Sequence, residues 1–210
     1  MAIAAARWAP RVNVAWLVFA ALLADFLLGC FALAGLESAH VPVDYAHAHY
    51  LTFTFPYSHG FVALVLWSLL FGALAASIHR ADRRPVFLVV AGVVLSHFVL
   101  DALVHVVGLP LFGDTSAKVG LGLWRNMPLE LVLETLLCVV GAVMFWRTAA
   151  SSARSRYGIA VFMLIFCALT WTPLAASQPP ELGQLVPGWI ATPPLLAAIA
   201  YAIDRKRAAG

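Results

Sequence analysis

Residues 85–107 read PVFLVVAGVVLSHFVLDALVHVV, a long apolar run whose only polar side chains are Ser96, His97, Asp101 and His105. Crossing a hydrocarbon core of about 30 Å takes about 20 apolar residues in a helix. Because lipid offers no hydrogen-bond partners to an exposed backbone, a run of this kind must be helical there. The stretch therefore predicts a transmembrane helix that carries ionisable groups.

The rest of the chain repeats the apolar pattern. Apolar residues make up 63% of the sequence and the mean hydropathy is +0.91, which is far above the usual composition of a soluble domain. We therefore predict an all-α fold, a polytopic bundle that forms a single transmembrane domain over residues 1–210. Polar, proline and glycine residues divide it into six predicted spans, at about 14–36, 58–78, 85–107, 127–146, 157–176 and 185–203.

The basic residues predict the orientation of this six-helix bundle. Lys and Arg concentrate in the cytoplasmic loops of membrane proteins. Eleven of the thirteen fall on one side of the predicted spans, and only Lys118 and Arg125 fall on the other. We therefore expect the N-terminus and the C-terminus in the cytoplasm. The net charge of +3 without a basic block argues against nucleic acid as a partner, and the lipid bilayer is the expected one.

Two long loops are predicted on the outer side, at residues 37–57 and 108–126. Loops of this length in a small protein are often functional. The first carries Asp44, His47 and His49, which are candidates for a lid over a site.

Ionisable side chains inside a span are costly, so each is a functional hypothesis. His97, Asp101 and His105 stand at i, i+4 and i+8, and they share one stripe because each residue turns a helix by about 100°. With the N-terminus inside, these three groups lie in the outer half of the bilayer. Four more fall in that half, namely Asp25, His59, Glu130 and Glu134.

Imidazole and carboxylate together form a ligand set that Zn²⁺, Fe²⁺ or Mn²⁺ accepts. The predicted metal ligands are His59, His97, Asp101, His105 and Asp25, and the first expectation for the cofactor is a divalent ion such as zinc. His97 and His105 are about 12 Å apart along a helix axis, too far to share one ion comfortably. Either one ion uses Asp101 with one of these histidines, or two ions share the stripe.

Three motifs in this part of the chain resemble a known family. They are PYSHG at residues 56–60, SHFVLD at 96–101 and GLGLW at 120–124, and they are similar to motifs of the YdjM-like family of bacterial membrane-bound metal-dependent hydrolases. The resemblance covers about residues 20–135. It implies that His59, His97 and Asp101 are associated with a metal in a bacterial cytoplasmic membrane, with His105 as a neighbour. Typical members also have a histidine near the N-terminus, and Asp25 stands in its place here.

Together these features predict a metal-dependent hydrolase whose site faces the periplasm. A bound metal ion lowers the pKa of its water toward about 7, and Glu134 or Glu130 is the predicted general base. A lipid or a small periplasmic molecule is the expected substrate. Two alternatives use the same residues: a small transporter or channel that relays protons or ions, and a haem-binding protein with two of the histidines as axial ligands.

Overall fold

A computed structural model describes residues 1–148, 152–175 and 178–204 of the chain. This part is mostly helical, with two short β-hairpins. The helices are α1 (Ala2–Ala5), α2 (Val14–Ala21), α3 (Leu23–Leu33), α4 (Tyr45–Ala48), α5 (Phe61–Ile78), α6 (Arg83–Val104), α7 (Met127–Trp146), α8 (Ala153–Thr170) and α9 (Leu182–Ile203). Three 3₁₀ turns lie at Arg80–Asp82, Leu123–Asn126 and Thr172–Ala175. The strands are β1 (Ser38–His40), β2 (Thr52–Thr54), β3 (Leu109–Pro110) and β4 (Lys118–Val119).

Within the described residues, the five helices α5 to α9 are long and apolar enough to cross a membrane, and α2 with α3 adds a sixth if the bent pair is one span. Large apolar side chains such as Leu66, Leu70 and Leu74 of α5 are exposed on the outside of the bundle. An apolar surface of this kind suits lipid rather than water. The structure thus supports the predicted all-α membrane bundle, while the number of six spans and the side of each terminus stay predictions.

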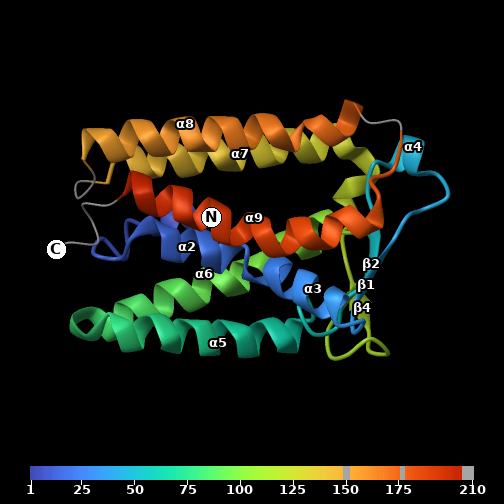
Figure 1. The fold of residues 1–210 in the computed structure, drawn as a ribbon, viewed down its shortest axis with the longest axis horizontal. Coiled ribbons are helices and arrows are strands. Elements are labelled where there is room, and N and C mark those ends of the chain that lie inside the picture. Colours follow the sequence, from blue (N-terminus) through green and yellow to red (C-terminus); the bar gives the residue numbers. More distant parts are fainter. Residues whose placement is uncertain (149–151, 176–177, 205–210) are drawn as a thin grey trace.

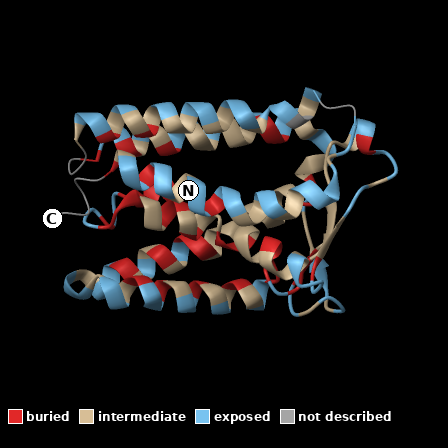
Figure 2. Cartoon of the chain, in the orientation of Figure 1, coloured by how far each residue is buried: buried red, intermediate tan, exposed pale blue. Residues whose placement is uncertain are grey.

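The helices form three layers (Figure 1). The α7–α8 hairpin lies along one side, the α5–α6 hairpin lies along the other, and α9 packs with α2 and α3 between them. Buried residues concentrate where α2, α5 and α6 meet, whereas α8 and α9 are mostly exposed (Figure 2). The ionisable stripe of α6 therefore begins at the edge of this buried core, since His97 and Asp101 are partly buried.

The first predicted span, 14–36, is not one straight helix. The chain bends by 51° between α2 and α3, although the sequence has no proline or glycine at that point. His97 Nδ1 donates a hydrogen bond of 2.8 Å to the carbonyl oxygen of Ala21, the last residue of α2. A side chain that takes a carbonyl out of the helical ladder is a recognised cause of a bend. The bend therefore frees a carbonyl oxygen that holds the His97 ring in place.

The next two predicted spans are correct in position, but their ends differ by a few residues. α5 begins at Phe61 rather than at residue 58, so His59 lies in the turn before the helix. Gly60 caps that helix, and a Cβ there would lie 2.6 Å from the carbonyl oxygen of Pro56. α6 ends at Val104, and His105 follows it with extended backbone.

The two long loops form hairpins that the sequence did not predict. β1 pairs antiparallel with β2, and β3 pairs antiparallel with β4. Both hairpins and α4 lie at one end of the bundle, and the connection between α5 and α6 lies at the opposite end (Figure 1). The two long loops thus lie at the same end of the bundle, which is what their predicted position on one side of the membrane requires.

The N-terminal segment packs into the bundle. The residues of α1 are buried, and the helix packs against α2, α6 and α7. Val12 is fully buried, and Arg11 forms an ion pair of 3.2 Å with Asp82 before α6. This segment therefore fills space between the helices from the middle of the bundle, where α1 lies, to the end that lacks the hairpins, where Arg11 meets Asp82.

Asp204, which the sequence reasoning passed over, ties three elements together at the same end. Its carboxylate accepts hydrogen bonds from the backbone N–H of Val14 (3.1 Å) and from Ser155 Oγ (3.1 Å), and its own carbonyl accepts one from Asn13 Nδ2 (3.0 Å). These contacts join the start of α2, the start of α8 and the end of α9. The predicted end of the fifth span at Ala176 and the basic residues from 205 onward lie outside the described residues.

Candidate metal site

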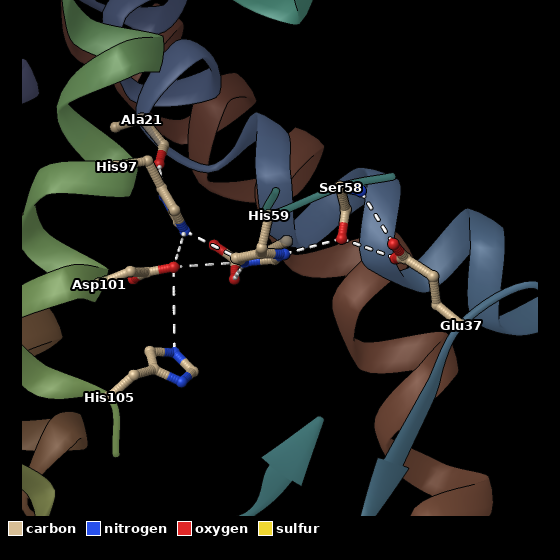
Figure 3. Close-up of polar contacts among 8 residues, drawn as sticks. Ala21, Glu37, Ser58, His59, His97, Asp101 and His105 are labelled. Carbon is tan, nitrogen blue, oxygen red and sulfur yellow. Dashed lines mark hydrogen bonds and ion pairs between the residues drawn. The ribbon is translucent and has the colours of Figure 1, made fainter. Parts of the chain in front are cut away.

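The ionisable stripe of α6 faces a cluster of imidazoles. Three Nε2 atoms surround one oxygen of Asp101, the Oδ2 atom: that of His97 lies at 3.4 Å, that of His59 at 3.7 Å and that of His105 at 3.9 Å (Figure 3). This oxygen is buried and makes no hydrogen bond. A buried carboxylate oxygen without a partner is costly, so its surroundings call for a positive charge.

Asp25 adds a second carboxylate to the cluster. Its Oδ1 atom lies 3.8 Å from His59 Nε2. One ligand atom from each of Asp25, His59 and His97 can be chosen so that all three lie within 4.8 Å of one another. The candidate ligand atoms thus come from α3, from the turn before α5 and from α6.

The spacing of the donor atoms suits a single ion. His59 Nε2 and His97 Nε2 are 3.3 Å apart, and the distances from these atoms to Asp101 Oδ2 are 3.7 and 3.4 Å. Two ligands of a tetrahedral zinc ion, each bonded at about 2.0–2.1 Å, lie about 3.3–3.4 Å apart. His59, His97 and Asp101 therefore have nearly the separations of three zinc ligands.

The hydrogen bonds of His59 and His97 through Nδ1 leave the Nε2 atom of each ring available to bind a cation. A carbonyl oxygen only accepts, so His97 carries a proton on Nδ1 where it meets Ala21. In the neutral form its Nε2 then has a lone pair. His59 Nδ1 is likewise engaged, at 2.7 Å from Ser58 Oγ, and its Nε2 faces that of His97. Two imidazoles that meet through Nε2 beside two carboxylates form a site that fits a cation.

All five residues predicted as metal ligands are therefore in one cluster. The sequence reasoning separated His97 from His105 by their rise along a helix. That distance is a poor guide here, because both side chains reach toward Asp101 from opposite sides. His105 also packs against Trp124, with the ring centroids 3.8 Å apart.

The glutamates predicted as general bases lie around a neighbouring cavity of about 310 Å³. Glu130 is buried and stands one turn before Glu134 on α7. The cavity walls also include Phe53 and Trp124, and both of these rings contact His105. An aromatic layer thus stands between the glutamates and the metal-facing histidines, and the role of a general base stays a prediction.

The loop residues considered as a lid divide into two groups. Asp44 and His47 pair with each other at 2.7 Å on the exposed surface. His49 instead lines the cavity with Tyr45 and Tyr50. One of the three loop candidates therefore lines the same open pocket as Glu130 and Glu134.

Glu37 is the residue that the sequence reasoning missed. It is buried, and it accepts hydrogen bonds from the backbone N–H groups of Tyr57 (2.7 Å) and Ser58 (2.9 Å) and from Ser58 Oγ (2.6 Å). Ser58 in turn contacts His59 (Figure 3). Only the Ser58-His59 step had a signal in the sequence, because Glu37 reaches Ser58 from 21 residues away.

Comparisons with models of protein families, with curated proteins and with solved structures found no match to this chain. The case for a function therefore rests on the residues and their geometry.

Proposed function

We propose that this chain is a membrane protein that binds a divalent metal ion between His59, His97, Asp101 and Asp25, and that it is a metal-dependent hydrolase of the YdjM-like type. The observation that carries the proposal is the buried, unpaired Oδ2 atom of Asp101 with three imidazole Nε2 atoms around it. The hydrolase class rests on the motif resemblance alone.

Each member of the cluster has a distinct task in this proposal. His59 and His97 offer neutral imidazole ligands whose orientation is fixed through Nδ1. Asp101 and Asp25 supply negative charge, which offsets the charge of the ion in a part of the bundle that water enters poorly. When bound, a divalent ion would polarise a substrate oxygen or activate water for attack.

The cavity beside the cluster is the proposed substrate site. Its volume, about 310 Å³, is at the small end of the range of known ligand pockets. Tyr45, Trp124 and Trp189 give it aromatic walls, and Glu130 and Glu134 give it an acidic side. Glu134 is the proposed proton acceptor on the substrate side. This arrangement suits a small molecule or the head group of a lipid.

The proposed location is a bacterial cytoplasmic membrane with the site toward the periplasm. The hairpin end of the bundle carries Lys118 and Arg125, whereas the opposite end carries Arg11 and the three arginines before and at the start of α6. The excess of positive charge at the second end supports a cytoplasmic position for it.

Metal analysis tests this proposal. Protein purified in detergent through a tag without histidine, and then incubated with Zn²⁺ and desalted, is expected to retain a stoichiometric amount of metal in mass spectrometry. His97→Ala is expected to lose that metal, and the exposed His47→Ala is the matched control that keeps it. Wild-type protein without stoichiometric divalent metal would exclude the proposal.

The alternatives gain no support from the structure. A transporter would need a polar path from the cluster to the far end, but α1 places buried Ala2, Ile3 and Ala4 between α2, α6 and α7 in the middle of the bundle. A haem would need an apolar slot between two histidines. His59 and His97 instead meet at 3.3 Å beside carboxylates.

A further inference from the structure

We propose that Glu37 and Ser58 are positioning residues of the metal site, because they fix the proton of His59 on Nδ1 and leave Nε2 free to bind an ion. This inference rests on the proposed function. Neither residue touches the ion in this proposal. Both act through His59, as partners of metal-bound histidines generally do.

Burial is the first observation. Glu37 is 4% exposed, Ser58 is 0% exposed and His59 is 3% exposed, so water does not compete for their hydrogen bonds. A buried carboxylate is tolerated only when it is well hydrogen-bonded, and Glu37 accepts three bonds. The same burial keeps Ser58 Oγ away from any substrate, which rules it out as a nucleophile.

The direction of the hydrogen bonds follows from the groups involved. An ionised carboxylate only accepts, so the single proton of the Ser58 hydroxyl points to Glu37 Oε2 at 2.6 Å. Ser58 Oγ can then only accept from His59, at 2.7 Å. The proton of neutral His59 is therefore on Nδ1, and its Nε2 lone pair faces His97 and Asp101.

Glu37 is remote from His59 in the sequence, but it is bonded to the backbone of the turn that carries His59. Glu37 directly precedes β1, and its Oε1 atom accepts both backbone N–H groups of the turn that carries His59. Gly60 then caps α5 at a point where the carbonyl oxygen of Pro56 leaves no room for a Cβ. The turn, the hairpin and the helix thus hold His59 in one orientation.

Glu37→Gln separates this positioning role from a structural one. The glutamine carbonyl can still accept from Tyr57 and Ser58, so the turn keeps its anchor. Its NH₂ group, however, must donate to Ser58 Oγ, and the hydroxyl then donates to His59 Nδ1. We expect the proton of His59 to move to Nε2, the atom that should bind the ion.

The test has two measurements on metal-free and metal-titrated protein in detergent. Nitrogen-15 NMR of histidine-labelled protein, with His59 assigned through a His59→Gln variant, should show Nδ1–H in the wild type and Nε2–H in Glu37→Gln. Zinc affinity, measured by competition with a chromophoric chelator, should fall about 10- to 100-fold. The exposed Glu181→Gln is the matched control and should change neither quantity.

The outcomes distinguish this inference from the proposed function. Wild-type protein that binds no zinc would end the metal proposal, while the NMR comparison would still decide the direction of the relay. An unchanged His59 tautomer in Glu37→Gln, or an unchanged affinity in a zinc-binding protein, would overturn the inference. If Glu37→Gln fails to fold, Ser58→Ala replaces it, because that change removes only a small buried hydroxyl group. We expect it to lower the zinc affinity by a similar factor. Full affinity in Ser58→Ala would equally overturn the inference.

Discussion

Asp101 is the residue on which the cluster depends, since it is the point where three imidazoles converge. Its position on α6, one turn after His97, follows directly from the i, i+4 spacing in the sequence. What the spacing could not show is that His59 and His105 would approach the same oxygen. Those contacts depend on the turn before α5 and on the end of α6.

Asp101→Asn should therefore weaken metal binding strongly. The change removes a negative charge next to the ion and places an NH₂ group among the imidazoles, so the loss of zinc affinity should exceed the roughly 10- to 100-fold cost of losing an outer-shell partner. Chelator competition measures it. Asp114→Asn is the matched control, because Asp114 pairs with Lys118 on the exposed hairpin. Equal affinity in the two variants would contradict the role of Asp101.

Glu134→Gln tests the substrate side of the site. If Glu134 accepts a proton in hydrolysis, kcat toward an ester or lipid substrate should fall about 10²- to 10⁴-fold. Metal content should stay at the wild-type level, because the glutamate lies around the neighbouring cavity rather than in the cluster. A variant that hydrolyses the same substrate at the wild-type rate would remove Glu134 from the mechanism.

For single residues, the sequence was informative about depth along the spans and about the stripe on α6, but silent about how the side chains of different spans face one another. Depth grouped His59, His97, Asp101, His105 and Asp25, and their side chains lie close together in the structure. It also grouped Glu130 and Glu134 with them, and the structure places these two behind Trp124 and Phe53. Glu37 could not be found, because nothing local distinguishes it from an ordinary loop carboxylate.

Among the elements, the segment after β4 controls the end of α6. The backbone N–H groups of Leu121 and Gly122 donate to the carbonyl oxygens of Ala102 and His105, each at 2.8 Å. These bonds satisfy carbonyls that the helix end would otherwise leave open. The GLGLW motif therefore has a structural explanation, since it closes α6 and holds His105 near Asp101.

Gly120→Ala should disturb this closure. Gly120 has a φ of +154°, and a Cβ there would lie 2.6 Å from the carbonyl oxygens of both His105 and Val106. The control is Gly113→Ala, which has a φ of +65° but no atom within 4 Å of the added Cβ. Backbone strain alone costs about 1–3 kcal/mol. Thermal unfolding should thus show a larger loss of stability for Gly120→Ala, and equal losses would contradict the close contact.

The elements themselves were mostly predictable, and their exceptions have physical reasons. Apolar length located α5 and α6 to within a few residues, because the requirement for a hydrocarbon-spanning helix leaves little freedom. The bend between α2 and α3 was not predictable, since it comes with a hydrogen bond from His97, which is remote in sequence. The hairpins were missed because strands of two or three residues are too short to show an alternating pattern.

For the whole molecule, the orientation in the membrane is the prediction to test. In a background with the three cysteines replaced by alanine, Thr115→Cys lies on the β3–β4 hairpin and Ala81→Cys lies between α5 and α6. A membrane-impermeant maleimide should label the first variant in intact bacterial cells and the second only after permeabilisation. The reverse pattern would invert the proposed topology.

The buried position of α1 has an electrical consequence. Its apolar residues pack between α2, α6 and α7 around the middle of the bundle, where they close the way from the cluster to the end opposite the hairpins, so an ion at His97 would exchange with the hairpin side alone. A charge that enters and leaves by the same side crosses only part of the membrane voltage, which is worth about 2.3 kcal/mol per 100 mV for a full crossing. Voltage steps on a membrane that contains this protein should therefore produce brief displacement currents as ions bind and leave, with no steady current.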